Sequence, residues 1–215
     1  MKKLSLITLG LLLGLANACH AATYQFRLYA HGVVPPVQAV APPSFVPSGA
    51  VLVASTLAGH IPTMTSDLTM GAVSNAVADA QSSVGHSTGS WYFEVTLNAG
   101  GYAGVEAAPN AGGNPPGLFA NSAGYNTNGG LYSNGANLEV NNKFAAPRLM
   151  GVAVNAATGV ATFYDGCNIF ASASFGTGNT VFAAVGLQGA SSVATINFGA
   201  TPFSCAVPNG YQPGW

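Results

Sequence analysis

The stretch from Gly89 to Val105, GSWYFEVTLNAGGYAGV, constrains the fold more than any other part of the chain. Side chains alternate along SWYFEVTL, which places Tyr92, Glu94 and Thr96 on one face of a predicted strand. The opposite, apolar face consists of Trp91, Phe93, Val95 and Leu97. The turn NAGG and a second short strand, YAGVEAA, follow. The stretch therefore predicts a hairpin of an antiparallel sheet whose apolar face nucleates a core.

The second half of the chain repeats this pattern. LMGVAVN, VATFY, CNIFASASF, TVFAAVGL and ATINFG are further predicted strands. The turn NAATG places Gly159 where a positive φ is expected, and Asp165-Gly166 predicts a tight hairpin turn. Upstream, VLVAST is a predicted strand. Residues 66–80 fit strands or, through the alanines of AVSNAVADA, a helix, and the neighbouring strands favour strands.

Short strands at this spacing predict an all-β fold. We expect one antiparallel β-sandwich domain over residues 51–215.

The first residues have the pattern of a signal peptide. Two lysines precede an apolar run from Leu4 to Leu15 and the small residues ANACHAA, and the run is too short for a membrane span. Cleavage after Ala21 would remove residues 1–21. Cleavage before Cys19 would instead leave a lipid-bearing cysteine. Either way we expect an exported protein, in the periplasm or outside the cell.

Residues 22–50 predict an extended, proline-rich segment rather than a domain. YQFRLYA alternates as a single strand, with Tyr24, Phe26 and Leu28 on one side. GVVPPVQAVAPPSFVPSG follows and contains five prolines. Proline removes a ladder donor and holds the preceding residue extended, so this part is linker or edge-strand material.

The charge content excludes several classes of partner. Charged residues make up 5% of the chain, and removal of residues 1–21 leaves three cations against six carboxylates, a net charge of −3. Without a basic patch, binding to nucleic acid or to an anionic membrane surface is not expected.

Cys167 and Cys205 are the cysteines that remain if Cys19 leaves with the signal peptide. In an oxidising compartment an even pair favours a disulfide over two separate buried thiols. The bond would tie the C-terminal segment to a hairpin and stabilise the fold by about 3–4 kcal/mol.

The sequence can be compared with what two classes of enzyme require, serine hydrolases and retaining glycosidases. GHSTG at 85–89 matches the G-x-S-x-G elbow of hydrolases, but that motif needs a helix after the serine, and here a strand follows, so Ser87 is predicted to be a turn residue. A retaining glycosidase needs two carboxyl groups about 5–5.5 Å apart. No carboxylate has an acidic neighbour two or four residues away, although carboxylates of different strands can still meet. The carboxylates are Asp67, Asp79, Glu94, Glu106, Glu139 and Asp165.

Metal and cofactor chemistry have little support. His31, His60 and His86 have no partner at a metal-ligand spacing, and no cofactor is expected. Glu94 lies among aromatic residues, where it is either a catalytic acid or, as we favour, a framework carboxylate that accepts hydrogen bonds from a loop.

Residues 109–137 are rich in glycine and asparagine and predict a long loop, which is either an ordered binding loop or a disordered insertion. Rigid rings beside adaptable amides are typical of binding surfaces, although each ring can equally pin its own loop to the core. The candidate contact residues are Phe119, Tyr125, Asn126, Tyr132 and Asn134.

Several of these motifs, in this order, resemble the SPRY (B30.2-like) domain family, a bent β-sandwich of concanavalin-like jelly-roll type. The resemblance covers about residues 55–208, and its closing NFG…PF…P…GY pattern is similar to that of bacterial and phage members rather than animal signalling ones. It departs at Pro147-Arg148-Leu149, where the family usually has Gly-Asp, and at Asn155, where it often has an acid. The motifs are TGSWYFEV, GYAGVEA, AGYNTNG, MGVAVNAATGVATFYDG, VFAAVGL and INFGATPFSCAVPNGY.

The resemblance implies a non-catalytic binding module that grips a protein or a carbohydrate through loops at one end of the sandwich. Because those loops vary between members, no ligand-contact residue carries over. Two alternatives remain open. One is an envelope, appendage or phage-tail-derived subunit that assembles through its N-terminal segment, and the other is a jelly-roll glycosidase.

Overall fold

The computed structural model describes residues 49–54, 61–72, 77–107, 114–138 and 147–215. The predicted signal peptide and nearly all of the predicted extended segment lie outside these residues. The chain divides into two units, Met1–Pro42 and Pro43–Trp215, and all the described residues belong to the second. Among the described residues, no helix is long and apolar enough to cross a membrane.

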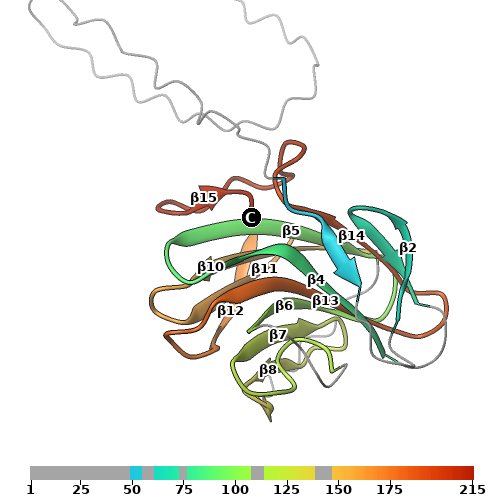
Figure 1. Cartoon of the computed structure of the whole chain (residues 1–215), viewed down its shortest axis with the longest axis horizontal. Coiled ribbons are helices and arrows are strands. Elements are labelled where there is room, and N and C mark those ends of the chain that lie inside the picture. The colour runs from blue at the N-terminus through green and yellow to red at the C-terminus, as the bar shows by residue number, and fades with distance from the viewer. Residues whose placement is uncertain (1–48, 55–60, 73–76, 108–113, 139–146) are drawn as a thin grey trace, which may run out of the picture. The chain divides into compact units, whose positions relative to one another are not determined.

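The described domain contains strands and turns but no helix, which confirms the all-β prediction (Figure 1). The strands are β1 (Leu52–Ala54), β2 (Thr63–Ser66), β3 (Thr69–Gly71), β4 (Val77–His86), β5 (Ser90–Leu97), β6 (Gly101–Ala107), β7 (Ser122–Asn126), β8 (Leu131–Ser133), β9 (Ala136–Asn137), β10 (Arg148–Asn155), β11 (Val160–Asp165), β12 (Asn168–Ser174), β13 (Val181–Gln188), β14 (Val193–Asn197) and β15 (Gln212–Pro213).

These strands form two sheets that pack as a sandwich. The seven-stranded sheet has the order β1-β4-β13-β6-β7-β8-β9. The eight-stranded sheet has the order β12-β11-β10-β5-β14-β3-β2, and β15 pairs with β5. Every pair is antiparallel except β15 with β5. The predicted antiparallel sandwich is therefore confirmed.

Strand β5 supplies the middle of the core as its alternation predicts. Phe93, Val95 and Leu97 are fully buried between the sheets, and Trp91 is half-buried against the same cluster. The opposite face of β5 is buried too, since Tyr92 is 0% and Glu94 3% exposed. A covered outer face requires a further segment of chain across the sheet.

The C-terminal segment is that cover. The backbone N–H groups of Ser204 and Cys205 each donate to the Glu94 carboxylate, with N···O distances of 2.9 Å. Tyr92 donates its hydroxyl to the same carboxylate at 3.2 Å and packs edge-on against Phe203. Burial and the neighbouring Glu94 raise the pKa of Tyr92. Glu94 is therefore a framework carboxylate, as the sequence favours.

The predicted disulfide between Cys167 and Cys205 is confirmed. It joins the segment held by Glu94 to the turn between β11 and β12. Beyond it, β15 runs alongside β5, and the chain re-enters the core at Trp215, which is 3% exposed.

The structure decides between strand and helix for residues 66–80 and corrects the loop that is predicted at 109–137. Residues 66–80 contain β3 and the start of β4, so the helical alternative is wrong where the structure describes them. The predicted loop 109–137 is wrong from residue 122 onward, because β7, β8 and β9 form one margin of the seven-stranded sheet.

Gly124 explains why that region looks like a loop in the sequence. A Cβ at this position of β7 would lie 2.0 Å from the carbonyl oxygen of Pro116, so the glycine makes room for another segment to cross the sheet. Glycine is otherwise depleted in strands, and its presence here hides the strand from pattern analysis.

Trp215→Ala should destabilise the fold strongly. The indole N–H donates to the carbonyl of Val84 at 2.7 Å, and the ring packs edge-on against Phe93. We expect a loss of about 3–5 kcal/mol in the free energy of unfolding, measured by urea titration. The matched change at exposed Gln212, Gln212→Ala, should stay within about 0.5 kcal/mol. A loss below about 1 kcal/mol for Trp215→Ala would contradict this role.

The disulfide predicts a specific labelling result. Denatured, unreduced protein consisting of residues 22–215 should bind no thiol reagent, and reduction should expose two thiols per chain, read by mass spectrometry. Cys205→Ser should lower the free energy of unfolding by about 3–4 kcal/mol in the chain-entropy picture. Labelling without reductant would show that Cys167 and Cys205 are not joined.

Candidate binding surface

Five of the described segments lie beside one another at one end of the sandwich. Residues 87–89, 156–159 and 175–180 are the connections that follow β4, β10 and β12, and residues 119–121 and 134–135 flank β7 and β8. We call this set the loop end. Antiparallel pairing brings these connections to the same end, because β4, β10 and β12 all run towards it.

Backbone hydrogen bonds hold three of the segments together. The N–H of Ala156 donates to the carbonyl of Gly89 at 2.9 Å. The N–H of Phe175 donates to the carbonyl of Gly159 at 2.7 Å. The segments following β4, β10 and β12 thus form one connected surface rather than three independent turns.

Asparagine side chains attach the remaining two segments. The side-chain oxygen of Asn134 accepts from the backbone N–H of Asn121 at 2.8 Å, and its Nδ2 donates to the carbonyl of Ser174 at 3.0 Å. The hydroxyl of Ser133 donates to the same carbonyl. Asn121 and Asn134 both have positive φ, a conformation that asparagine adopts more readily than most residues.

Gly159 is required where two of these segments meet. Its φ is +67°, as the sequence predicts, and a Cβ there would lie 2.2 Å from the carbonyl oxygen of Gly176. The backbones of the two turns can approach this closely only without a side chain. The loop end therefore has a fixed shape set by glycine and asparagine.

The loop end carries no charged side chain within its five segments. Its exposed polar groups are hydroxyls and amides, among them Thr88, Asn121, Thr158 and Thr177. Charge lies elsewhere in the described domain: Arg148 and Asp165 form an ion pair at the opposite end of β10 and β11. This surface can offer a partner neutral hydrogen bonds and shape.

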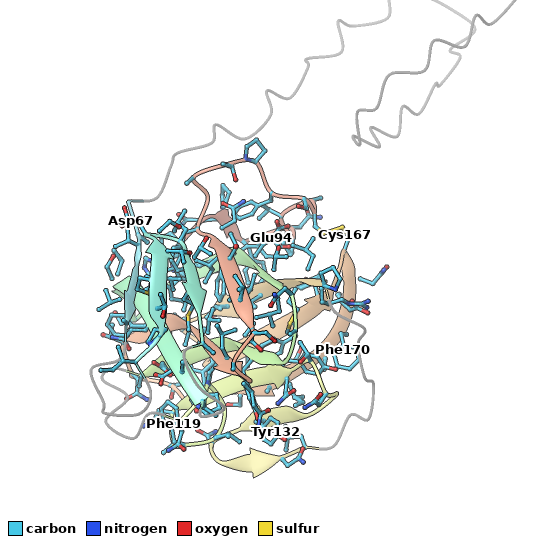
Figure 2. The ribbon with its side chains drawn as sticks, turned by 90° about the vertical axis from the view of Figure 1, so that its right-hand side faces the viewer. Asp67, Glu94, Phe119, Tyr132, Cys167 and Phe170 are labelled. Carbon is cyan, nitrogen blue, oxygen red and sulfur yellow. A yellow bond between two sulfur atoms is a disulfide. The ribbon has the colours of Figure 1, made fainter. Side chains whose placement is uncertain are left out.

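Two of the predicted contact residues lie in this surface. Phe119 is half-buried with its carbonyl accepting from Ser122, and Asn134 is exposed. Tyr132 lies outside it, half-buried against the ring of Tyr102 in the seven-stranded sheet. Figure 2 shows Phe119 and Tyr132 near the same margin of the domain.

The other two lie in the interior. Tyr125 is 1% and Asn126 3% exposed. The ring of Tyr125 contacts Phe170 at a centroid distance of 4.6 Å, and burial raises its pKa. Asn126 caps the β7–β8 turn, where its side-chain oxygen accepts from the N–H of Asn128 at 2.6 Å. Neither side chain is presented to a partner, so for Tyr125 the ring serves the core.

Sequence reasoning missed the threonines of the loop end. Thr88, Thr158 and Thr177 stand in ordinary-looking turns, and the signal that marks them is the glycine beside each one, at 89, 159 and 178, with positive φ. Residue types typical of turns identify each of the three turns in the sequence. They do not show that the three turns lie together in the fold.

Among the described residues, the buried carboxylates Asp79, Glu94 and Glu106 do not form the pair that a glycosidase needs, and Glu139 lies outside the described residues. Glu94 follows the inward-facing Phe93 on β5, and Glu106 follows the inward-facing Val105 on β6. Because β5 and β6 belong to different sheets, the two glutamates point to opposite outer faces of the sandwich. Asp79 and Glu106 pair with residues four positions apart on β13, about 13 Å along the strand.

Within the described ranges, no arrangement of side chains supports the hydrolase or the metal-site hypothesis. Ser87 lies in the turn between β4 and β5, with a strand on each side, as predicted. Among the residues that the structure describes, no three histidines, cysteines or acids gather to hold a metal ion.

Comparison with solved structures identifies the fold. The SPRY domain of human HERC1 matches with a TM-score of 0.55 and 13% identity over 63% of this chain and 91% of that one. The TRIM65 PSpry domain matches with a TM-score of 0.54 and 16% identity over 68% of this chain and 91% of that one. Stonustoxin matches with a TM-score of 0.52 and 14% identity, covering 68% of this chain but 27% of its own.

At the level of sequence, no family model and no curated protein matches the chain. The structural matches lie far below the identity at which function transfers. What they establish is that the described domain has the SPRY-type β-sandwich fold that the motifs suggest.

Gly159→Ala should disturb the loop end more than a matched glycine change. Gly178 also has positive φ, +79°, but nothing lies within 4 Å of a Cβ there. Gly178→Ala should cost about 1 kcal/mol for its backbone conformation, and Gly159→Ala about 1–3 kcal/mol more for the clash with Gly176. Urea unfolding of both variants measures the difference. Equal losses would mean that the two turns do not need their close contact.

Proposed function

We propose that this protein is an exported, non-catalytic binding module that recognises a protein or a carbohydrate through its loop end. The observation that carries the proposal is the loop end itself. In it, hydrogen bonds join turns that are far apart in the sequence into one surface without charged side chains. Binding and catalytic residues are commonly carried by loops on a rigid scaffold, and here the scaffold is a fully packed sandwich.

The fold supports a role in recognition. The solved structures that share it include SPRY domains, whose family the sequence motifs also resemble, and that family is one of binding modules. The buried carboxylates support the non-catalytic part of the proposal. Glu94 accepts hydrogen bonds from the C-terminal segment, and Glu106 points to the opposite outer face of the sandwich. No cofactor enters the proposed function.

The disulfide and the N-terminal sequence support export. A disulfide between Cys167 and Cys205 persists in oxidising compartments, which include the periplasm and the extracellular space. The signal-peptide pattern over residues 1–21 points the same way. We place the working protein at residues 22–215, with an extended segment before a single domain that begins at about residue 51.

The chemistry of the loop end predicts how binding depends on salt. Hydroxyl and amide contacts are not screened by ions as ion pairs are. Affinity for the natural partner should therefore change less than about threefold between 50 mM and 500 mM salt, in contrast to a surface that binds through charge.

The test is a substitution within the loop end, read against a matched one elsewhere. Residues 22–215 are screened on a glycan array and against extracellular proteins, and the affinity of each hit is measured with Thr158→Arg and Thr195→Arg. Both threonines are exposed, but Thr195 lies on the outer face of β14, away from the loop end.

Thr158→Arg should reduce affinity at least tenfold, because it introduces a long charged side chain into a neutral contact surface, and Thr195→Arg should leave it unchanged. Thermal unfolding of each variant checks that the fold is intact. Hits whose affinity is the same for both variants would overturn the loop end as the binding surface.

A further inference from the structure

The sequence contains three Asn-Gly pairs, at residues 128–129, 134–135 and 209–210. Such a pair can modify itself, because the backbone nitrogen of the glycine can attack the side-chain carbonyl carbon of the asparagine. The attack needs a glycine nitrogen that is free of hydrogen bonds, an asparagine side chain that is free to turn towards it, and access of water. The three pairs differ in whether the fold meets these needs.

The pair that begins at Asn134 is held at both of its reacting groups. The side-chain oxygen of Asn134 accepts from the N–H of Asn121, and its Nδ2 donates to the carbonyl of Ser174. The N–H of Gly135 donates to the carbonyl of Gly117 at 2.9 Å. Attack would break all of these bonds, so the fold protects this pair.

The pair that begins at Asn128 is held at its glycine. Asn128 is exposed, but Gly129 is buried, and its N–H donates to the carbonyl of Asn126 at 2.9 Å. The attacking nitrogen is therefore already occupied and is withdrawn from water.

The pair formed by Asn209 and Gly210 is free. Both residues are exposed, and within the described part of the chain neither the Asn209 side chain nor the N–H of Gly210 has a hydrogen bond. They are the central residues of a turn that is closed by a bond from the N–H of Tyr211 to the carbonyl of Pro208 at 3.1 Å. The φ of +86° at Gly210 is typical of a type II turn. A Cβ at Gly210 would have nothing within 4 Å, so this turn has room to rotate.

We propose that Asn209 is a site of spontaneous deamidation. The nitrogen of Gly210 bonds to Cγ of Asn209, the Cγ–Nδ2 bond breaks, and the side-chain nitrogen leaves as ammonia with the proton that the Gly210 nitrogen releases. Water then opens the resulting five-membered ring, and the carboxyl group that forms ionises. Opening at Cγ gives an aspartyl residue, and opening at the main-chain carbonyl carbon gives an isoaspartyl residue. The proposal goes beyond the function assigned to the loop end and does not depend on it.

The place of this turn in the fold gives the modification a consequence. On one side of the turn, Cys205 is joined to Cys167 and donates to Glu94. On the other side, Gln212 pairs with Trp91 as β15 runs alongside β5. An isoaspartyl residue adds one carbon atom to the main chain between these two anchored parts. The disulfide is covalent, so the pairing of β15, which rests on hydrogen bonds, is the part that gives way.

The rate experiment uses residues 22–215 with the disulfide intact, incubated at mildly alkaline pH, where the glycine nitrogen loses its proton most readily. Digestion at acidic pH and mass spectrometry measure, at each of the three pairs, the mass gained when an amide becomes an acid. Modification at Asn209 should be at least about tenfold faster than at Asn128 and Asn134, because the protected pairs react only from rare, locally opened states. In guanidinium chloride with reductant, the three rates should agree within about threefold, since no fold then protects any pair.

Asn209→Gln serves as the matched variant. Glutamine would have to form a six-membered ring, which closes far more slowly, so the mass gain in the peptide that contains residue 209 should disappear. A mass gain that persists in this variant would assign the reaction to another residue and overturn the proposal. Equal rates at the three pairs of the folded protein would also overturn it, as would faster modification at Asn128 or Asn134.

Hydrogen exchange tests the effect on β15. The N–H of Gly214 donates to the carbonyl of Tyr92 at 2.9 Å, and the N–H of Trp215 donates to that of Phe198 at 3.2 Å. In the isoaspartyl form, separated by anion exchange, these two N–H groups should exchange at least about threefold faster than in the unmodified protein. Asn209→Asp adds the same charge on an ordinary main chain and should exchange as the unmodified protein does. Unchanged exchange in the isoaspartyl form, or an equal increase in Asn209→Asp, would overturn the role of the added main-chain carbon.

Discussion

The C-terminal segment covers the outer face of β5, and this cover depends on the carboxylate of Glu94. It is a charge on the outer face of β5, and burying a charge without hydrogen bonds is costly. Backbone N–H groups from Ser204 and Cys205 meet that need and in doing so bring the C-terminal segment across the sheet. The disulfide, the pairing of β15 with β5 and the return of Trp215 to the core all result from that course of the chain. A residue that looks catalytic by its surroundings is thus the anchor of the cover.

Scarce charge affects the inside and the outside of the domain in different ways. Inside, Asp79, Glu94 and Glu106 are buried, and the described surface is left with few ionised groups. Outside, glycine and asparagine give the loop end its shape, and threonine hydroxyls give it its polarity. The recognition proposed for this surface would rely on fit and neutral hydrogen bonds, for which a rigid arrangement of turns is an advantage because less freedom is lost on binding.

The sequence by itself predicted most of the strands outside residues 109–137 and the tight turns, and it favoured a disulfide between Cys167 and Cys205 and a framework role for Glu94. Alternation, turn residues such as Gly159 and the count of cysteines can be read from the sequence because they do not depend on contacts between distant segments. Only the tertiary structure decided which faces are covered. Alternation shows that Tyr92 and Phe93 point to opposite sides of β5, but only the structure shows that both are buried, Phe93 between the sheets and Tyr92 beneath the C-terminal segment. In the same way, the pairing of β7 with β6 takes Tyr125 from a loop rich in asparagine and glycine into the core. The meeting of the turns at the loop end depends likewise on contacts between residues far apart in the chain.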